Sequence, residues 1–414
     1  MMKRLLIVPL VLIMLVLKAF IISPVEAGIK AAATDTFMSQ KKKKTVVSKQ
    51  VDHHAIGCIL PLTGRYASAG NKALEAVILA ADIFDPLKRY PFKLVIEDSK
   101  SDATTARAAV AKLAREKVLC ILGPFGNAEA VAAAGEAQRL KIPIITLTQK
   151  EKITDIGDNV FRNYMTNEMQ IRGLVTYTMN EMDLTRFAVI YPDDHYGREM
   201  EKLFRDEVLR QGGKNIKSQY YNKTQVDFGN VIKAITDTKR ISSKEKEFKK
   251  SDAEHKQVIG FDALFLPDSP ARVHMIVPQL AYYNVRGIKL LGTSLWNSPD
   301  LLKTVGEYLD GAVFADGFCL NSFYPEANDF IDVFYTHYGR EPDVIDALVY
   351  DAARIVVTTI EENDIETREQ LKNSLLRLEN RRGVTGNTSF SGKRDANKDV
   401  FILTVKAGQI VQIK

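Results

Sequence analysis

A glycine-bearing loop near the start of the patterned part of the chain raises the question of phosphate binding. The stretch IGCILPLTGRYASAG, residues 56–70, places an apolar run directly before this loop, and a helix-like segment follows from about Asn71. A strand, a glycine loop and a helix N-terminus together can hold a phosphate. A dinucleotide site needs glycines spaced as G-x-G-x-x-G, whereas Gly64 and Gly70 here flank a segment that contains Tyr66. The loop therefore argues against a nucleotide site.

Residues that could catalyse a reaction do not occur at recognisable spacings. The sequence contains no G-x-S-x-G elbow, no H-E-x-x-H zinc motif and no P-loop lysine motif. The segment PDDHYG, residues 192–197, groups acids with His195 and Tyr196, and a solvated turn explains it more simply than an acid–base site does. Adjacent His53 and His54 would point to opposite faces of a strand. We therefore expect no catalytic residue, no metal ligand and no cofactor.

The three cysteines, Cys58, Cys120 and Cys319, lie within apolar runs. Their odd number and wide spacing argue against a disulfide framework and against a zinc site. We expect all three to be small core residues.

The basic charge of the protein comes from its first fifty residues. Residues 1–50 carry nine lysines or arginines against two acids, which leaves a formal charge of only −1 for residues 51–414 out of the total of +6. The segment expected to fold is therefore nearly neutral, and we do not expect a nucleic-acid partner.

The first residues have the pattern of a secretory signal peptide. A basic MMKR precedes the apolar LLIVPLVLIMLVL, and VEA before Gly28 resembles a cleavage site after Ala27. The alternative, an uncleaved membrane anchor, is weakened by Pro9 and Lys18. We expect residues 1–27 to be removed, residues 28–50 to form a flexible basic linker and the mature protein to be periplasmic or secreted.

From residue 51, short apolar runs alternate with helix-period segments. The expected strands of the first series lie at 55–62, 92–98, 118–124 and 142–148, and the helices between them include 102–117 and 127–140, capped by Asp102 and Asn127. Such a βαβ series predicts a parallel, doubly wound sheet. The chain is also too long for one ordinary core, so a second lobe is expected.

A second series of the same kind follows residues 167–182. Its expected strands lie at 186–192, 218–222, 261–267, 288–293 and 311–318, and its helices include 198–213, 227–239 capped by Asp227, and 269–284 capped by Ser269. The charge-dense segment 239–257 is expected to be a surface excursion. Three helices near 326–339, 343–362 and 367–380 and two short strands within 401–414 complete the chain.

Taken in order, these segments resemble the type I periplasmic binding proteins, the Leu/Ile/Val-binding-protein-like solute receptors. The resemblance covers nearly all of residues 51–414 and rests on IGCILPLTGRYASAGNKALEAVILAADIF, ILGPFGNAEAVAAAGEAQRLKIPIITLT, AVIYPDDHYGREMEKLFRDEVLRQGG and FIDVFYTHYGREPDVIDALVYDAARI. Within residues 262–318, PQLAYYN, LLGTSLWNSPDL and YLDGAVFADGF are similar to lipoprotein activators of penicillin-binding proteins.

The family resemblance implies two α/β lobes around a central cleft, with three chain crossings near residues 165, 319 and 383. Lobe one would comprise 51–165 and 320–382, and lobe two 166–319 and 383–414. The resemblance also implies a non-enzymatic protein that delivers a small amino-acid-like or carboxylate ligand to the membrane subunits of an ABC importer. The ligand-binding residues expected from it are Tyr66, Ser68, Asn127, Thr146, Thr148, Tyr196, Ser269, Ser294 and Trp296.

The sequence departs from the amino-acid-binding pattern at the position of one acid. Family members hold the ligand's ammonium with an acid at the position that matches Ser294, and a serine cannot neutralise a cation. Asp194, Asp268 or Asp316 could replace it. The alternative function is therefore a regulator of cell-wall synthesis that contacts a penicillin-binding protein and leaves the cleft idle.

Overall fold

The computed structural model describes residues 51–83, 85, 87, 92–236 and 259–414, and residues 49–414 form one compact unit. The expected signal peptide, the basic linker and the charged segment 239–257 lie outside the described residues. None of the helices in the described part is long and apolar enough to cross a membrane.

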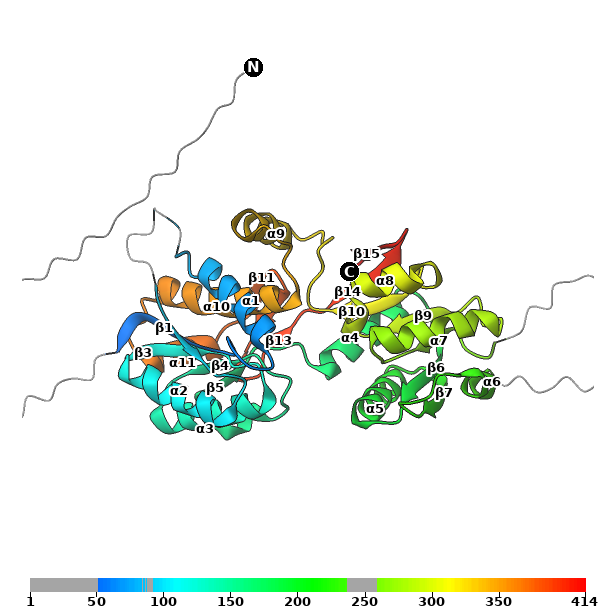
Figure 1. Ribbon diagram of the computed structural model, residues 1–414, viewed down its shortest axis with the longest axis horizontal. Coiled ribbons are helices and arrows are strands. Elements are labelled where there is room, and N and C mark those ends of the chain that lie inside the picture. Colours follow the sequence, from blue (N-terminus) through cyan, green and yellow to red (C-terminus); the bar gives the residue numbers. More distant parts are fainter. Residues whose placement is uncertain (1–50, 84, 86, 88–91, 237–258) are drawn as a thin grey trace, which may run out of the picture. The chain divides into compact units, whose positions relative to one another are not determined.

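The first lobe is built on a parallel five-stranded sheet in the order β2-β1-β3-β4-β5 (Figure 1). Its strands are β1 Asp52–Leu60, β2 Lys93–Asp98, β3 Val118–Leu122, β4 Ile144–Thr146 and β5 Val160–Arg162. The helices that belong with it are α1 Ala67–Ala80, α2 Ala103–Arg115, α3 Asn127–Leu140, η1 Ile153–Ile156, α9 Pro325–Tyr338, α10 Val344–Asn363 and α11 Arg368–Leu376.

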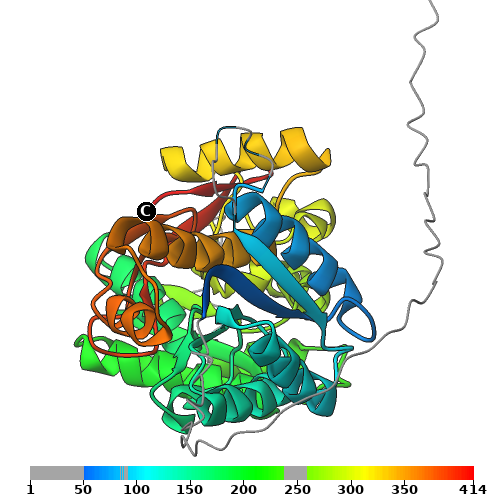
Figure 2. The ribbon, with the colours of Figure 1, turned by 90° about the vertical axis from the view of Figure 1, so that its left-hand side faces the viewer.

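Alternation along β1 divides the core of this lobe between the two faces of the sheet. Ile56, Cys58 and Leu60 pack in the cluster that includes α1 and α10, whereas Ala55 and Ile59 pack in the cluster formed with α2 and α3. Figure 2 shows these two helix pairs on opposite sides of the blue strands. Helices therefore cover both faces of this sheet, as is usual for a parallel sheet.

The second lobe is built on a seven-stranded sheet in the order β15-β14-β10-β9-β8-β6-β7. The five strands from β6 to β10 pair in parallel, and β14 and β15 add an antiparallel edge. The strands are β6 Arg186–Pro192, β7 Lys214–Tyr221, β8 Ala263–Phe265, β9 Lys289–Gly292, β10 Val313–Asp316, β14 Phe401–Lys406 and β15 Gln409–Gln412. The helices are α4 Asn167–Asn180, α5 His195–Arg210, α6 Gly229–Ile235, α7 Pro270–Tyr282, η2 Ser294–Trp296, α8 Pro299–Val305 and η3 Gly306–Tyr308. The predicted fold class, two parallel-sheet α/β lobes, is confirmed.

Residues between α11 and β14 in the sequence form a small third sheet, which the sequence pattern did not predict. It pairs β11 Arg381–Gly383, β12 Gly386–Ser389 and β13 Asn397–Lys398 antiparallel. Val384, Phe390 and Ala396 beside these strands pack in the first lobe's core, and Arg162 N donates to Arg394 O along β5. We therefore propose that the third change of lobe follows Lys398 rather than residue 383.

The structure confirms some of the predicted helix N-caps and shows that others are wrong. Asp102 caps α2 by accepting from Thr105 N, and Ser269 precedes Pro270 at the start of α7, although its hydroxyl makes no capping bond. Asn127 is not a cap, because α3 starts at Asn127 itself and Gly126 is the N-cap. Asp227 accepts from Gly229 N, but the cap position of α6 is Phe228.

The three cysteines are buried free thiols, as predicted. Cys58 and Cys120 pack in the first lobe's core and Cys319 in the second lobe's core. Burial raises the pKa of the Cys58 thiol and raises that of Cys120 to about 12 and that of Cys319 to about 11. All three therefore remain protonated and unreactive at neutral pH.

Candidate ligand-binding cleft

A cavity of about 740 Å³ lies at the carboxyl ends of the parallel strands. Segments that follow β1, β2, β3, β4 and β5 line it from the first sheet, and segments that follow β9 and β10 line it from the second. The carboxyl edge of parallel sheets is where doubly wound folds bind ligands, because successive strands end there in loops. Residues of α10 and of the third sheet complete the lining, namely Val344, Ile345, Leu348, Thr385 and Lys398.

Three of the nine expected binding residues, Tyr66, Asn127 and Ser294, line this cavity. Tyr66 is the N-cap of α1 and is 42% exposed, with the Arg65 guanidinium 5.4 Å from its ring centroid. Ser68 is the second residue of the same helix, is exposed to solvent and does not line the cavity. Whether a ligand contacts these side chains stays a prediction.

Asn127 is held in place by Thr148, which is another of the expected residues. Thr148 is buried, and its Oγ1 donates a 2.7 Å hydrogen bond to Asn127 Oδ1 while accepting from Lys150 N. Thr148 therefore positions a cavity side chain without lining the cavity. Thr146 does neither, because its hydroxyl faces β5 and donates to Phe161 O at 2.9 Å.

Ser294 and Tyr196 are fixed by other side chains of the second lobe. Ser294 N donates to Gln170 Oε1 at 2.9 Å, and Gln170 Nε2 donates to Ser294 Oγ at 3.3 Å. Tyr196 is not part of the cavity lining. Its hydroxyl donates to Thr293 Oγ1 at 3.4 Å. Burial raises the Tyr196 pKa to about 12, so this phenol stays neutral.

Ser269 and Trp296 were expected in the cleft and lie elsewhere. Ser269 N and Oγ both donate to the preceding Asp268 Oδ1. Trp296 is 1% exposed and packs in the second lobe's core, with its ring 6.3 Å from that of Phe314. Its neighbours Leu295 and Asn297 do line the cavity.

Of the three acids considered as replacements for the missing ammonium partner, Asp316 alone lines the cavity. Asp194 caps α5 through Gly197 N and pairs with Lys223 Nζ at 2.8 Å. Asp268 accepts hydrogen bonds from Tyr221 Oη and Ser269 N. Asp316 is 2% exposed, and burial raises its pKa to about 7.

Glu129 is a second buried acid of the cavity, and the sequence did not indicate it as a site residue. It lies in the first turn of α3, is 3% exposed and accepts a 2.5 Å hydrogen bond from Ser99 Oγ. Its Oε2 lies 2.0 Å from the position that a Cβ on Gly126 would take, so the carboxyl folds back over the helix N-terminus. Burial raises the Glu129 pKa.

The rest of the cavity surface combines apolar side chains with a few polar ones. Phe125, Leu147, Met165 and Leu295 supply apolar surface from both lobes. Gln149 Nε2 donates to Tyr164 Oη at 2.8 Å, and both residues line the cavity. An apolar lining with a few placed polar groups is typical of a small-molecule site.

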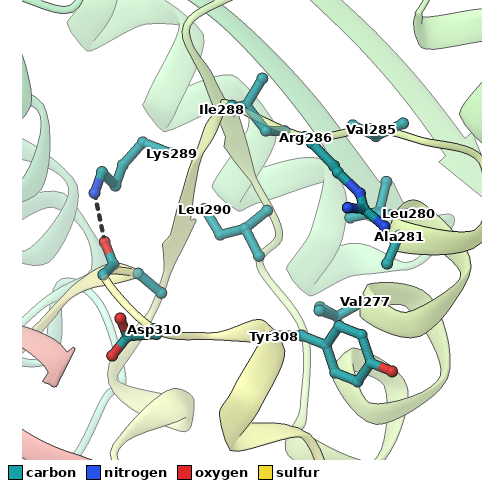
Figure 3. A pocket seen from close by; sticks show the side chains of 13 residues that line it. Val277, Leu280, Ala281, Val285, Arg286, Ile288, Lys289, Leu290, Tyr308 and Asp310 are labelled. Carbon is teal, nitrogen blue, oxygen red and sulfur yellow. Dashed lines mark hydrogen bonds between the residues drawn. The ribbon is translucent and has the colours of Figure 1, made fainter. Parts of the chain in front are cut away.

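A second pocket of about 340 Å³ lies at the opposite, amino end of β9 (Figure 3). Val277, Leu280 and Ile288 give it apolar walls, and Lys289 Nζ donates to Gly311 O at 2.8 Å. Among the residues that the structure describes, no group of three or more His, Cys, Asp or Glu side chains could hold a metal ion.

Comparisons with known proteins agree with this arrangement. The family model described as periplasmic binding protein matches residues 54–409. The Leu/Ile/Val-binding protein homolog 7 of Brucella abortus is 24% identical over 192 residues, which are 43% of this chain and 48% of that protein. The chain thus spans about half the length of the curated relatives that it matches.

Solved structures share the fold over most of the chain. A structure from Rhodospirillum rubrum, assigned to a branched-chain amino acid ABC transporter, has a TM-score of 0.76 at 24% identity and covers 87% of this chain and 99% of its own. An ABC-transporter solute binding protein from Rhodopseudomonas palustris, in complex with 3,4-dihydroxybenzoic acid, has a TM-score of 0.63 at 19% identity. The match covers 87% of this chain and 96% of that protein. The chain belongs to the periplasmic binding protein family and has its two-lobed type I fold.

Proposed function

We propose that this protein is a non-enzymatic solute receptor, periplasmic or secreted, that binds a small amino-acid-like or carboxylate ligand and delivers it to the membrane subunits of an ABC importer. The observation that carries the proposal is the cavity of about 740 Å³ to which both lobes contribute polar side chains. A ligand that contacts both lobes favours their closure, and closure is the signal that a membrane partner can recognise.

The polar groups of the cavity suit a ligand with both hydrogen-bond donors and acceptors. Asn127 offers an amide from the first lobe, and Asn297 and Asp316 offer an amide and a carboxyl from the second. Asp316 supplies the acid that is missing at Ser294, so an ammonium or hydroxyl group would have an acceptor there. The names of the similar proteins, which refer to branched-chain amino acids and an aromatic acid, support these two ligand classes.

The cavity also favours binding over catalysis. None of the residues that line the described cavity is a histidine or a cysteine. The hydroxyl of Ser294 accepts a hydrogen bond from an amide, Gln170 Nε2, which cannot take a proton from it as a general base would. A nucleophile and its base are thus not paired at this site.

A binding panel tests the proposal. Thermal shift with L-amino acids, aliphatic carboxylates and benzoates, followed by isothermal titration calorimetry, is expected to find at least one ligand that binds one per chain. Asn127→Leu should weaken that ligand about 10-fold or more because it removes an amide partner. Lys303→Ala, at an exposed ion pair with Asp300, is the control that should not change the affinity. A wild-type protein that binds no panel member would contradict the proposal.

Regulation of a penicillin-binding protein remains the alternative hypothesis. The pocket of Figure 3 falls within residues 262–318, the segment with the local resemblance to activator lipoproteins. A pull-down from envelope extract separates the two functions. Recovery of importer subunits supports the solute receptor, and recovery of a penicillin-binding protein supports the alternative.

A further inference from the structure

Lys398 brings a buried amino group to the cavity. It belongs to β13 of the third sheet, lines the cavity and is 5% exposed. Its Nζ donates one hydrogen bond, to Thr388 Oγ1 at 2.7 Å across the β12–β13 pair. An ammonium group has three donors, so, as far as the described residues are concerned, this contact leaves two of them unused.

Two acids act on Lys398 through their charge, and other donors engage both oxygens of Asp351 and one oxygen of Asp399. Asp351 accepts hydrogen bonds from Val384 N, Thr385 N and Thr385 Oγ1. Asp399 Oδ2 accepts from Asn387 N at 3.0 Å and from Asn387 Nδ2 at 2.7 Å. Within the described part of the chain, Lys398 forms no ion pair with a nitrogen–oxygen distance of 4.0 Å or less, although both acids act on it electrostatically.

Burying an ammonium group without a direct counterion is costly. Burial lowers the Lys398 pKa, and the charges of Asp351 and Asp399 act in the opposite direction. An anionic group placed against Lys398 would supply the missing contact.

The other charged groups of the cavity decide where a carboxylate can lie. The N-terminus of α3 would ordinarily attract an anion, but the Glu129 carboxyl already lies there beside Ser99. The ionised form of Asp316, whose pKa burial raises to about 7, would repel a carboxylate from the end of β10. Lys398 is therefore the buried group of this cavity that is suited to an anion.

We propose that Lys398 binds a carboxylate group of the solute and thereby selects acids over their neutral amides. The inference rests on the proposed solute-binding function and specifies its ligand. The donor groups of the ligand, an ammonium or hydroxyls, would then face Asp316 and Glu129.

Comparing each acid with its own neutral amide tests directly whether Lys398 binds the carboxylate. Isothermal titration calorimetry would compare 3,4-dihydroxybenzoate with 3,4-dihydroxybenzamide, and L-leucine with L-leucinamide, on the wild type, on Lys398→Met and on Lys202→Met. Lys202 is the control because it lies on α5, is exposed and pairs with Asp206. Circular dichroism and the melting temperature would establish that each variant is folded.

We expect at least one acid to bind both the wild type and Lys202→Met about 30-fold or more tightly than its neutral amide does. The reason is that a charge-assisted hydrogen bond in a buried site is strong. In Lys398→Met this ratio should fall to about 3-fold or less, mainly through loss of the acid's affinity. An unchanged ratio in Lys398→Met would overturn the inference and leave the proposed function intact. A wild type that binds neither these pairs nor any other small solute would overturn both.

A measurement on the wild type covers the case in which Lys398→Met does not fold. In protein labelled with ¹⁵N-lysine, the Nζ resonance of Lys398, assigned with Lys398→Arg, should shift on addition of the acid and not of the amide. A Lys398 Nζ resonance that does not shift when the acid binds would overturn the inference.

Discussion

Asn297 donates a 2.7 Å hydrogen bond from Nδ2 to Oδ2 of Asp316 and so joins the segments that follow β9 and end β10. The same amide donates to Phe318 O at 2.9 Å, and Gly317 N donates to the second carboxyl oxygen of Asp316. Asn297 and Gly317 thus fix the orientation of Asp316, the acid that the described part of the second lobe contributes to the cavity. Because this acid is buried, its protonation affects both stability and ligand binding.

Replacing Asp316 with Asn should change how stability depends on pH. Burial raises the native-state pKa of Asp316 to about 7, whereas its ordinary value is near 3.8. Between these values the native state binds more protons than the unfolded state, so the wild type should lose stability as the pH rises from about 4 to about 7. The melting temperature of Asp316→Asn minus that of the wild type should therefore increase over this range and level off above it. Calorimetry at several pH values, with exposed Asp300→Asn as control, would contradict this if the difference stayed constant.

Gly292→Ala should destabilise the second lobe. A Cβ at this position would lie 2.2 Å from the ring of Trp296, which is packed in the core and cannot move aside easily. Overpacking of this kind costs about 1–3 kcal/mol. Gly306→Ala is the matched control, because the nearest atom to its Cβ would be 3.7 Å away. Equal urea midpoints for the two variants would show that Trp296 is not rigidly packed.

Thr148→Val should weaken ligand binding even though Thr148 does not line the cavity. The substitution removes the hydroxyl that holds Asn127 Oδ1, and one such hydrogen bond is worth about 3- to 10-fold in affinity. Thr146→Val removes a buried hydroxyl from the same segment without touching Asn127. Titration calorimetry with a panel ligand should show a loss for the first variant alone, and equal losses in both would argue against a positioning role.

Asp351→Asn should destabilise the junction between α10 and the third sheet. Asp351 is 3% exposed and accepts hydrogen bonds from Val384 N, Thr385 N and Thr385 Oγ1. An amide would direct its own N–H groups at one of these donors, at a cost of about 2–4 kcal/mol. Chemical denaturation measures this cost, and Asp329→Asn on the exposed face of α9 is the control. A variant as stable as this control would contradict the assignment.

The sequence predicted the two βαβ series because their strands are apolar and their helices are long and periodic. It missed β11, β12 and β13 because they are two to four residues long and contain Arg381, Asn387 and Lys398, so they carry no strand alternation. Their position depends on packing of Val384 and Phe390 against the first lobe, which is a tertiary effect.

The candidate site was predictable only where it follows strand ends. Tyr66, Asn127 and Ser294 line the cavity because each follows a strand of a parallel sheet. Trp296 has the same kind of position, but its ring turns into the core. Lys398 and Thr385 reach the cavity from a segment far along the chain, so no local spacing could indicate them.

The most direct measurement is a crystal structure of the protein with the panel ligand that raises its melting temperature most. We expect density for one molecule in the cavity, in contact with Asn127 from the first lobe and Asp316 from the second. Density in the pocket of Figure 3, or a molecule that contacts one lobe alone, would contradict the claim that the two lobes bind a solute between their strand ends.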